Sequence, residues 1–567
     1  MRIDKIEIKS YRSIAHLKFR VNNIGLIVGP NDAGKSNILS AIKLFFDCNA
    51  QTTSEDINSI TKRTQTDISI SFSALNASEQ KLLKKWNPGT NPTFMSIRKI
   101  CEINKKPRYV ERNSNNQISP GAIEKFLLGR FLLIPSQRDA SEEFANNVGS
   151  LFTEFISVRN KKLSEYRLNN MRRDWDNGLA RFRKHLNKNL EEIIGKVSVS
   201  LGVDELVLET SNSIDNILQC LILNIFNKYG KVPLSRHGHG IQSMLVMALH
   251  EALSSSERLL FIALEEPENH LHPNLIHHLM SRFLTKSGSR QWLVSTHSPI
   301  IVSHVQVNNI IRIMKDNEGL TCVTEFLNND KGCLQNKSLK LLNPIRNEVL
   351  FADKVILCEG DTECVILPNL GARLGVEYDI VRDNIACVNC EGEAFGDYIK
   401  LLNKFKIPWA ILCDNAFWQD GKWHKMASSV NLDKEARIIF KRIHPSKGLT
   451  FSSVSKILKD KFRTVCLDES IEAVILGNNE KHQRSVAEIL KLVCPGKYQD
   501  IISSAAKVNK NNLIEVMKKN KPIWAKAISI VIAPEDASDE FKKLLINLKK
   551  VKFANSIVYR KPKTEGI

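Results

Sequence analysis

The chain has 567 residues, 43% of them hydrophobic and 25% charged, which are ordinary values for a globular protein. This composition excludes a collagen-like, mucin-like or wholly disordered chain. Lysine and arginine number 81 against 61 aspartates and glutamates, so the formal net charge is +20. Such an excess favours a polyanionic partner, most often nucleic acid, although many basic proteins bind none.

The N-terminus and the cysteines bear on the compartment. MRIDKIEIKSYRS has no apolar core of signal-peptide length, and no apolar run approaches the ~18 residues of a membrane span. The 12 cysteines are scattered, which is typical of a reducing cytosol and not of a disulfide scaffold. Cys387 and Cys390 form one CxxC, which we interpret as two thiols in a strand and its turn. We therefore expect a cytoplasmic protein with no membrane partner.

The N-terminal part of the chain has the pattern of a sheet-containing domain. Residues 3–11 and 16–21 alternate between apolar and polar side chains, as half-buried strands do. Further predicted elements are buried strands at 24–29 and 131–136, a helix over 37–46 and a strand-like piece at 66–75.

A charged segment follows. Between Arg159 and Gly195 lie ten basic and five acidic residues, with apolar residues at helical spacing. We interpret 145–230 as long amphipathic helices inserted into the first domain. They form a dimerisation arm, a DNA-contacting strut or only a solvated charged face, and we favour the arm.

A second α/β pattern starts at Phe351. Short apolar strands are predicted at 355–360, 385–390 and 409–414, with helices between them, one of which runs through 397–402. This alternation predicts a second parallel sheet. The stretch 541–563 holds eight lysines or arginines and no acid.

The segment GPNDAGKS (29–36) has the GxxxxGK[ST] pattern of a P-loop, between an apolar strand and a helix. Its glycines let backbone N–H groups close around phosphate oxygens. Lys35 is expected to reach the β- and γ-phosphates and Ser36 to ligate Mg²⁺. The predicted nucleotide-binding residues of this segment are Gly29, Asn31, Gly34, Lys35, Ser36 and Asn37.

Three later segments carry further candidates for nucleotide chemistry. In LLFIALEEPENHLHP (259–273) an apolar strand ends in Glu265, which suits a place beside the Mg²⁺ shell, and Glu266, which could polarise the attacking water. In STHSP (295–299), His297 could sense the γ-phosphate. In SRHGHGIQ (235–242), two glycines and a helix start predict another anion-binding site, with the residues Ser235, Gly238, Gly240 and Gln242.

Taken together, the four segments resemble the ATP-binding-cassette type of ATPase, in its repair and chromosome-maintenance branch, over roughly residues 1–310. The resemblance implies that ATP is the cofactor. It also implies that SRHGHGIQ is the signature motif, which in that family meets the nucleotide bound by the other subunit. Glu265 stands where the family usually has aspartate, and glutamate can still reach the metal.

VILCEGDTE (355–363) is the sharpest signal of the C-terminal half. A hydrophobic strand ends in Glu359-Gly360 and a helix begins near Thr362, which resembles the way the Toprim fold places a catalytic glutamate. A later strand ends in Asp414, so a second carboxylate is expected nearby, at the carboxyl edge of the parallel sheet. Clustered carboxylates hold Mg²⁺ or Mn²⁺ with open water positions, and two such ions stabilise both oxygens of a phosphodiester displacement.

An ATPase of this kind followed by a Toprim domain resembles the OLD (overcoming lysogenisation defect) family of nucleases over nearly the whole chain. The resemblance implies DNA cleavage by metal ions in the Toprim domain, and an ATPase that dimerises and regulates. It also implies anti-phage defence, acting alone, with a Gabija-type helicase, or beside a retron reverse transcriptase and its msDNA.

The resemblance assigns site residues in the C-terminal half. Glu359 corresponds to the Toprim glutamate, and Asp414 to the first acid of a DxD motif whose second position here is Ala416. The resemblance also implies Asp361 and Glu363 as ligands of a second metal ion. In the later acidic helix it implies Glu472 first and Glu469 next. Lys521 is implied as the residue that faces the scissile phosphate, and Lys526 is its rival.

We therefore predict an α/β protein, with an ABC-type ATPase domain over 1–345, a helical dimerisation insertion at 145–230, and a Toprim α/β domain with a basic C-terminal segment over 346–567. The predicted function is an ATP-regulated, divalent-metal-dependent DNA endonuclease that forms a homodimer or larger homo-oligomer. An ATP-gated DNA clamp or sensor with a degenerate Toprim domain is the alternative, favoured by Ala416. A topoisomerase or primase is a weaker interpretation.

Overall fold

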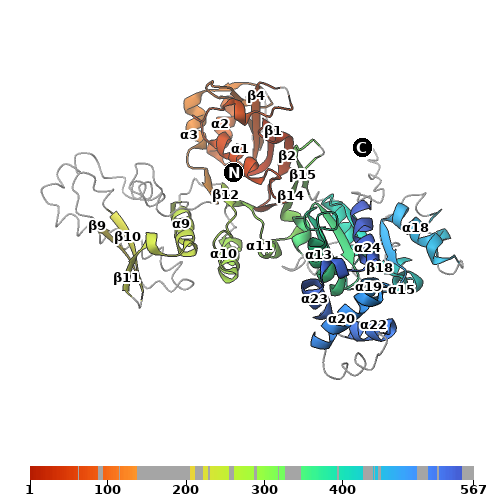
Figure 1. The fold of residues 1–567 in the computed structure, drawn as a ribbon. Helices are drawn as coiled ribbons and strands as arrows, with labels where there is room; N and C mark the ends of the chain where they lie inside the picture. The colour runs from red at the N-terminus through yellow and green to blue at the C-terminus, as the bar shows by residue number, and fades with distance from the viewer. Residues whose placement is uncertain are drawn as a thin grey trace. The chain divides into compact units, whose positions relative to one another are not determined.

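The computed structural model describes the chain except residues 62, 87–93, 114, 137–204, 211–220, 228–229, 254–260, 287–289, 317, 326–346, 392–394, 425–437, 440, 445–448, 494–508, 520, 522 and 552–567. The chain divides into two compact units, Met1–Glu325 and Phe326–Ile567 (Figure 1). The predicted domain boundary at 345/346 stays a prediction. None of the helices in the described ranges is long and apolar enough for a membrane crossing.

The first sheet of unit 1 is antiparallel and has the strand order β2-β1-β4-β5-β6-β7. Apolar and polar residues alternate along its long strands, and the apolar set faces the core. Its strands are β1 (Arg2–Tyr11), β2 (Ile14–Arg20), β4 (Gln65–Ser73), β5 (Phe94–Glu102), β6 (Arg108–Glu111) and β7 (Gln117–Ile118).

The second sheet of unit 1 has the order β15-β14-β3-β13-β12-β8 and is parallel except for the β14–β15 pair. Helix α1 (Lys35–Phe46) packs between the two sheets, because Ile38, Ile42 and Phe45 join a core with residues of both. The strands are β3 (Ile24–Val28), β8 (Phe131–Ile134), β12 (Phe261–Glu265), β13 (Gln291–Ser295), β14 (Ile310–Lys315) and β15 (Thr321–Glu325).

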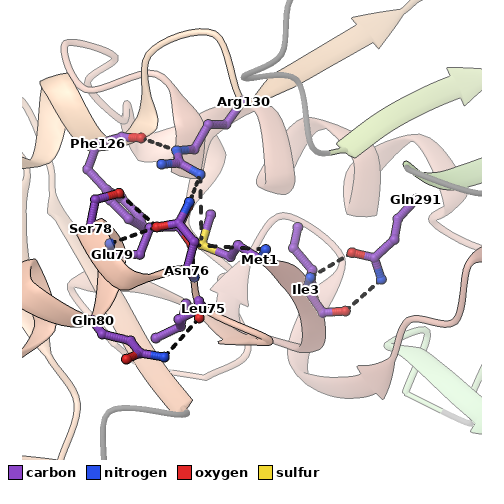
Figure 2. A network of polar contacts seen from close by, with 10 residues as sticks. All are labelled: Met1, Ile3, Leu75, Asn76, Ser78, Glu79, Gln80, Phe126, Arg130 and Gln291. Atoms are coloured by element: carbon purple, nitrogen blue, oxygen red, sulfur yellow. Dashed lines mark hydrogen bonds and ion pairs between the residues drawn. The ribbon is translucent and has the colours of Figure 1, made fainter.

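A buried polar network ties β1 to the surrounding elements, as Figure 2 shows. Gln291 Oε1 accepts from the Ile3 backbone N–H at 2.6 Å and its Nε2 donates to the Ile3 carbonyl at 2.7 Å, which joins the two sheets. Asn76 and Glu79 cap the start of α2 (Ala77–Trp86) reciprocally, each accepting the other's backbone N–H at 2.9 Å. Arg130 Nη1 lies 2.7 Å from Glu79 Oε1 and completes the network.

Glu79→Gln is expected to loosen this network. The side chain of Glu79 is buried, so removing its charge leaves Arg130 without its carboxylate partner. We expect amides of β1 and α2 to exchange with deuterium about tenfold faster or more, which mass spectrometry of the full chain measures. The exposed Glu55→Gln is the matched control. Unchanged protection in Glu79→Gln would show that the pair does not stabilise this region.

The third sheet of unit 1 corrects a prediction. Three antiparallel strands are described here in the order β11-β10-β9, namely β9 (Glu205–Thr210), β10 (Leu221–Asn227) and β11 (Gly230–Pro233). The helical prediction for 145–230 is therefore wrong for these strands, and residues 145–204 lie outside the described residues. The physical reason is local: ELVLET alternates and LILNIFN is an apolar run rich in strand formers, unlike the charged pattern of 159–195.

Unit 2 is built on a four-stranded parallel sheet with the order β17-β16-β18-β19. Its strands are continuous apolar runs, as expected for strands covered on both faces. They are β16 (Lys354–Cys358), β17 (Ile385–Asn389), β18 (Trp409–Asp414) and β19 (Thr464–Leu467). The three strands predicted in this half are confirmed, and so is the second parallel sheet.

Helices complete unit 2. One face of the sheet packs on a core formed with α13 and the last helices, α19 to α24, through residues such as Ile356, Leu412 and Trp524 (Figure 1). The helices are α13 (Asp361–Leu374), α14 (Phe395–Lys404), α15 (Asn415–Gln419), α18 (Phe451–Phe462), α19 (Ile471–Leu476), α20 (Glu480–Val493), α22 (Lys510–Lys519), α23 (Ile523–Val531) and α24 (Asp539–Lys550). The basic segment 541–563 is described only as far as residue 551.

Candidate active site

The loop between β3 and α1 depends on two glycines. Gly29 has φ +152°, and a Cβ there would lie 2.1 Å from the Ile313 carbonyl oxygen of β14. Gly34, the N-cap of α1, has φ +100°, and a Cβ would lie 2.3 Å from Thr321 Oγ1 of β15. Since other residues would be strained and would clash, glycine lets the loop pass close against the neighbouring strands.

Lys35 is folded over this loop. Its Nζ donates to the carbonyls of Gly29 at 3.0 Å and Pro30 at 2.8 Å, and the residue is only 5% exposed. Burial lowers the Lys35 pKa to about 8, although Glu266 and Glu268 oppose that shift. An ammonium held in this way is stabilised when a phosphate arrives, because the phosphate supplies the missing counter-charge.

The remaining side chains predicted to bind nucleotide in this segment are Asn31, Ser36 and Asn37. Asn31 and Ser36 are exposed at the loop. Asn37 Nδ2 donates to Ser13 Oγ at 2.8 Å, so its amide braces the loop against the β1–β2 turn. The described contact of Asn37 is therefore structural, and its predicted contact with nucleotide stays a prediction.

The ends of β12 and β13 adjoin, because Glu265 pairs with Ser295 in the parallel register. Glu266 follows with φ +40°, and its backbone N–H donates to the Ser295 carbonyl at 2.9 Å. Glu266 Oε1 lies 3.4 Å from His297 Nε2. Burial lowers the His297 pKa, and the charge of Lys35 lowers it further. The structure thus brings together Lys35, Glu266 and His297, from three segments that the sequence singled out separately.

Glu268 is a functional candidate that sequence reasoning missed. Its Oε1 accepts from Thr296 Oγ1 at 2.7 Å and from the His297 backbone N–H at 2.6 Å. Burial raises the Glu268 pKa. The carboxyl therefore holds the loop that carries His297, and its only sequence signal is its place in EEPENHLHP.

The predicted signature segment forms η3 (Leu234–Arg236) and the start of α9 (His239–Leu253). Gln242 points inward, where its Nε2 donates to the carbonyls of Leu234 at 3.2 Å and His237 at 2.8 Å. A Cβ on Gly240 would lie 2.8 Å from the His270 carbonyl oxygen, so this glycine permits a close approach. Gly238 and Ser235 are in the same segment, and the predicted nucleotide contacts of all four residues stay predictions.

Nucleotide affinity is expected to fall as the pH rises above about 8. Lys35 loses its proton there in the free protein, whereas bound phosphates favour the ammonium, so binding takes up a proton. Affinity then declines by up to roughly tenfold per pH unit. Titration calorimetry in two buffers of different ionisation enthalpy measures the proton uptake, and Lys35→Ala should show none. Wild-type affinity that does not change across this range would refute the assignment.

The carboxyl edge of the unit 2 sheet gathers acids. Cys358 pairs with Leu412, so Glu359, which follows β16, adjoins Asp414 at the end of β18. Burial raises the Glu359 pKa, and the charges of Asp414 and Glu363 raise it further, against a smaller opposing effect of Lys422. Asp414 Oδ1 accepts from the Phe417 backbone N–H at 2.9 Å, which fixes the carboxylate at the N-cap of α15.

Glu363, Glu472 and Lys521 form the neighbouring part of this edge. Lys521 Nζ lies 2.7 Å from Glu472 Oε1, and the Glu472 side chain is fully buried. Burial raises the Glu363 pKa, and the charge of Glu472 adds to this while Lys521 opposes it. Burial alone lowers the Lys521 pKa, but the hydrogen bond and charge of Glu472, with Glu363 and Asp414, raise it above its ordinary value. We call Glu359, Glu363, Asp414, Glu472 and Lys521 the acidic cluster.

Comparisons with known proteins find similarity in both halves of the chain. Residues 26–303 match the family "AAA domain, putative AbiEii toxin, Type IV TA system", and residues 350–415 match "Overcoming lysogenization defect protein-like, TOPRIM domain". The Old nuclease of Escherichia phage P2 is 24% identical over 543 residues, which are 86% of this chain and 89% of that protein. Along most of its length the chain is similar to the OLD family.

Two further relatives of this chain are nucleases by name. The OLD nuclease of Thermus scotoductus is 24% identical over 539 residues, which cover 88% of this chain and 97% of the relative. The endonuclease GajA of Bacillus cereus is 22% identical over 455 residues, which cover 73% of this chain and 75% of the relative. The expected resemblance to the OLD family is therefore confirmed, as is the order of an ATPase domain followed by a Toprim domain.

Other residues assigned by the OLD resemblance have described contacts outside the acidic cluster or none with it. Asp361 is exposed and accepts from Asn389 Nδ2 at 2.7 Å. Glu469 is exposed and lies 3.4 Å from Lys510 Nζ, which gives it a partner other than the cluster. Of the two rival lysines, Lys521 contacts Glu472, whereas no contact between the Lys526 side chain and the cluster is described. The metal-ligand roles of Asp361 and Glu469 stay predictions.

The acidic cluster suits a hard divalent cation. Carboxyls whose pKa values are raised by burial and by one another gain from a shared positive charge. Glu363 Oε2 and Glu472 Oε2 are buried without a hydrogen-bond partner, which leaves oxygen ligands for an ion. In the described ranges no three His, Cys, Asp or Glu residues make a ready-formed metal site. Mg²⁺ tolerates such a partial set, because it usually keeps several waters.

Proposed function

We propose that this chain is an ATP-regulated, divalent-metal-dependent DNA endonuclease. The observation that carries the proposal is the acidic cluster, in which Glu359 and Asp414 adjoin at the carboxyl edge of a parallel sheet. Ligand and catalytic groups of parallel sheets gather at this edge. The nuclease names of the relatives support the same reaction.

The proposed roles follow from charge. Glu359, Asp414 and Glu363 would hold Mg²⁺ or Mn²⁺, with Asp361 and Glu472 beside them. When bound, the metal supplies electrostatic stabilisation of the charge that develops on a scissile phosphodiester. Lys521, whose raised pKa keeps it positively charged, is suited to contact that phosphate.

The nucleotide site supports regulation by ATP. Lys35, Glu266 and His297 lie together beside the P-loop, a combination that fits phosphate binding and hydrolysis. We propose that the signature segment of one subunit completes this site in a homodimer. Light scattering with and without ATP tests the assembly, and a strict monomer under both conditions would count against it.

The cellular role is proposed from the family. Anti-phage defence, alone, with a Gabija-type helicase or with a retron reverse transcriptase and its msDNA, follows from the OLD resemblance. A relative named endonuclease GajA supports the Gabija form, and the genes that flank this one distinguish the three.

A DNA clamp or sensor with an inactive Toprim domain is the second candidate. Ala416 favours it, since it occupies the second position of the DxD motif in the first turn of α15. An assay on closed circular plasmid distinguishes the endonuclease from the clamp, because a circle without ends is opened only by an endonuclease. The proposed function predicts nicked or linear product with Mg²⁺ or Mn²⁺ and none with EDTA. Binding without cleavage under every metal and nucleotide condition would favour the clamp.

A further inference from the structure

The outer face of the first sheet, opposite its apolar core, carries rows of basic residues. The register β2-β1-β4-β5 aligns them across the strands. One row contains Arg20, Lys5, Ser71 and Ser96, the next contains Lys18, Glu7, Ser69 and Arg98, and the third begins with His16 and Lys9. Arg112, which follows β6, reaches over the sheet to Glu7. We call Lys5, Lys9, His16, Lys18, Arg20, Arg98 and Arg112 the basic face.

Glu7 is the carboxylate at the centre of the basic face, and it is shared. Arg112 Nη1 lies 2.5 Å from its Oε2, while His16 Nε2 at 2.9 Å and Lys9 Nζ at 3.2 Å approach its Oε1. Burial raises the Glu7 pKa, but these three partners together lower it to about 2. One ionised carboxylate cannot neutralise both the Arg112 guanidinium and the Lys9 ammonium, so positive charge remains at the centre of the sheet.

The edge of the face at β1 and β2 is more positive still. The Lys5 pKa is lowered chiefly by the adjacent Lys18, and by burial and Arg112, against the opposing effect of Glu7. A lysine whose pKa is lowered by a neighbouring lysine lies in a local field of positive charge. The acids farther along the sheet have other partners and so do not offset this positive charge. Asp67 Oδ2 lies 3.7 Å from Arg63 Nη1, and Glu102 Oε1 lies 2.6 Å from Arg108 Nη2.

We propose that the basic face binds the phosphate backbone of duplex DNA, as a second DNA-contacting surface apart from the acidic cluster; this rests on the proposed function. Neighbouring basic side chains of the sheet stand about 4.8 Å apart across β-strands and roughly 6.8 Å apart along one β-strand. At this spacing several of them can reach successive phosphates of the DNA. Lysine and arginine contacts to phosphate are independent of sequence and position the duplex. Charge complementarity thus identifies the occupant as a polyanion, and the proposed reaction makes it DNA.

Reversal of two exposed charges tests the basic face. Lys18 and Arg20 are exposed on β2, so Lys18→Glu with Arg20→Glu leaves the core intact. The matched control is Lys81→Glu with Lys84→Glu, the same charge change on the exposed side of α2. Binding of the full-length proteins to a short fluorescent DNA duplex is measured in EDTA, from about 0.05 to 0.2 M salt. Melting temperatures check that each variant is folded.

The β2 variant is expected to bind at least tenfold more weakly at about 0.1 M salt, with a slope of log affinity against log salt shallower by about two. The α2 control should match the wild type. Equal losses in both variants, or wild-type affinity and slope in the β2 variant, would overturn the proposal. A result that refutes the proposed nuclease function is distinguishable from these outcomes, because the wild type itself would then leave plasmid uncut with either metal.

Discussion

Glu359→Gln is expected to abolish metal-dependent DNA cleavage, lowering the rate by about 10³-fold or more. The substitution keeps the shape of the side chain and removes one carboxylate from the acidic cluster. Because burial, Asp414 and Glu363 all raise the Glu359 pKa, its negative charge is unfavourable in the folded protein without a cation. The glutamine variant should therefore be at least as stable as the wild type in EDTA, which separates lost chemistry from lost folding.

The control for this variant is Asp468→Asn, an exposed acid that follows β19 and is not a member of the acidic cluster. It should cleave at the wild-type rate. Mn²⁺ should raise the melting temperature of the wild type and of the control more than that of Glu359→Gln, since a ligand stabilises the state that binds it. Cleavage by Glu359→Gln at the wild-type rate would place the nuclease site elsewhere.

Lys35→Ala is expected to weaken nucleotide binding by about 100-fold, as loss of a charge-assisted contact with phosphate does. The buried ammonium already donates to two loop carbonyls and its pKa is lowered to about 8, so the phosphates are its natural counter-charge. Calorimetry with a non-hydrolysable ATP analogue measures the loss. Lys43→Ala, an exposed lysine in the last turn of the same helix, is the control. Full affinity in Lys35→Ala would refute the P-loop assignment.

Local patterns predicted the elements that position both sites. The run 24–29, the loop 29–36 and the helix that follows agree with β3, the P-loop and α1, because a buried strand, two glycines and helical periodicity are all local signals. The same holds for β16 and β18, whose acids sit at strand ends. The wrong helical prediction at β9 and β10 also has a local cause, since the helical pattern upstream gives way there to short strands.

What the sequence could not supply is contact between distant residues. Glu268 gains its role only when Thr296 and His297, 28 and 29 residues later, fold back onto it. The basic face likewise depends on strand register, which places Lys18 opposite Glu7 and Arg98 two strands farther on. The pairing of Lys521 with Glu472 is of the same kind, and only family resemblance had linked these two residues to one site.

The most direct test of the acidic cluster is the nicking of closed circular plasmid by wild type and Glu359→Gln side by side. Both proteins are assayed at the same concentration with Mg²⁺, with Mn²⁺ and with EDTA, in the presence and absence of ATP. We predict nicked and linear product from the wild type with a divalent metal, none with EDTA, and none above background from Glu359→Gln. Wild type that leaves the circle intact under all of these conditions, or a variant that opens it equally fast, would contradict the account.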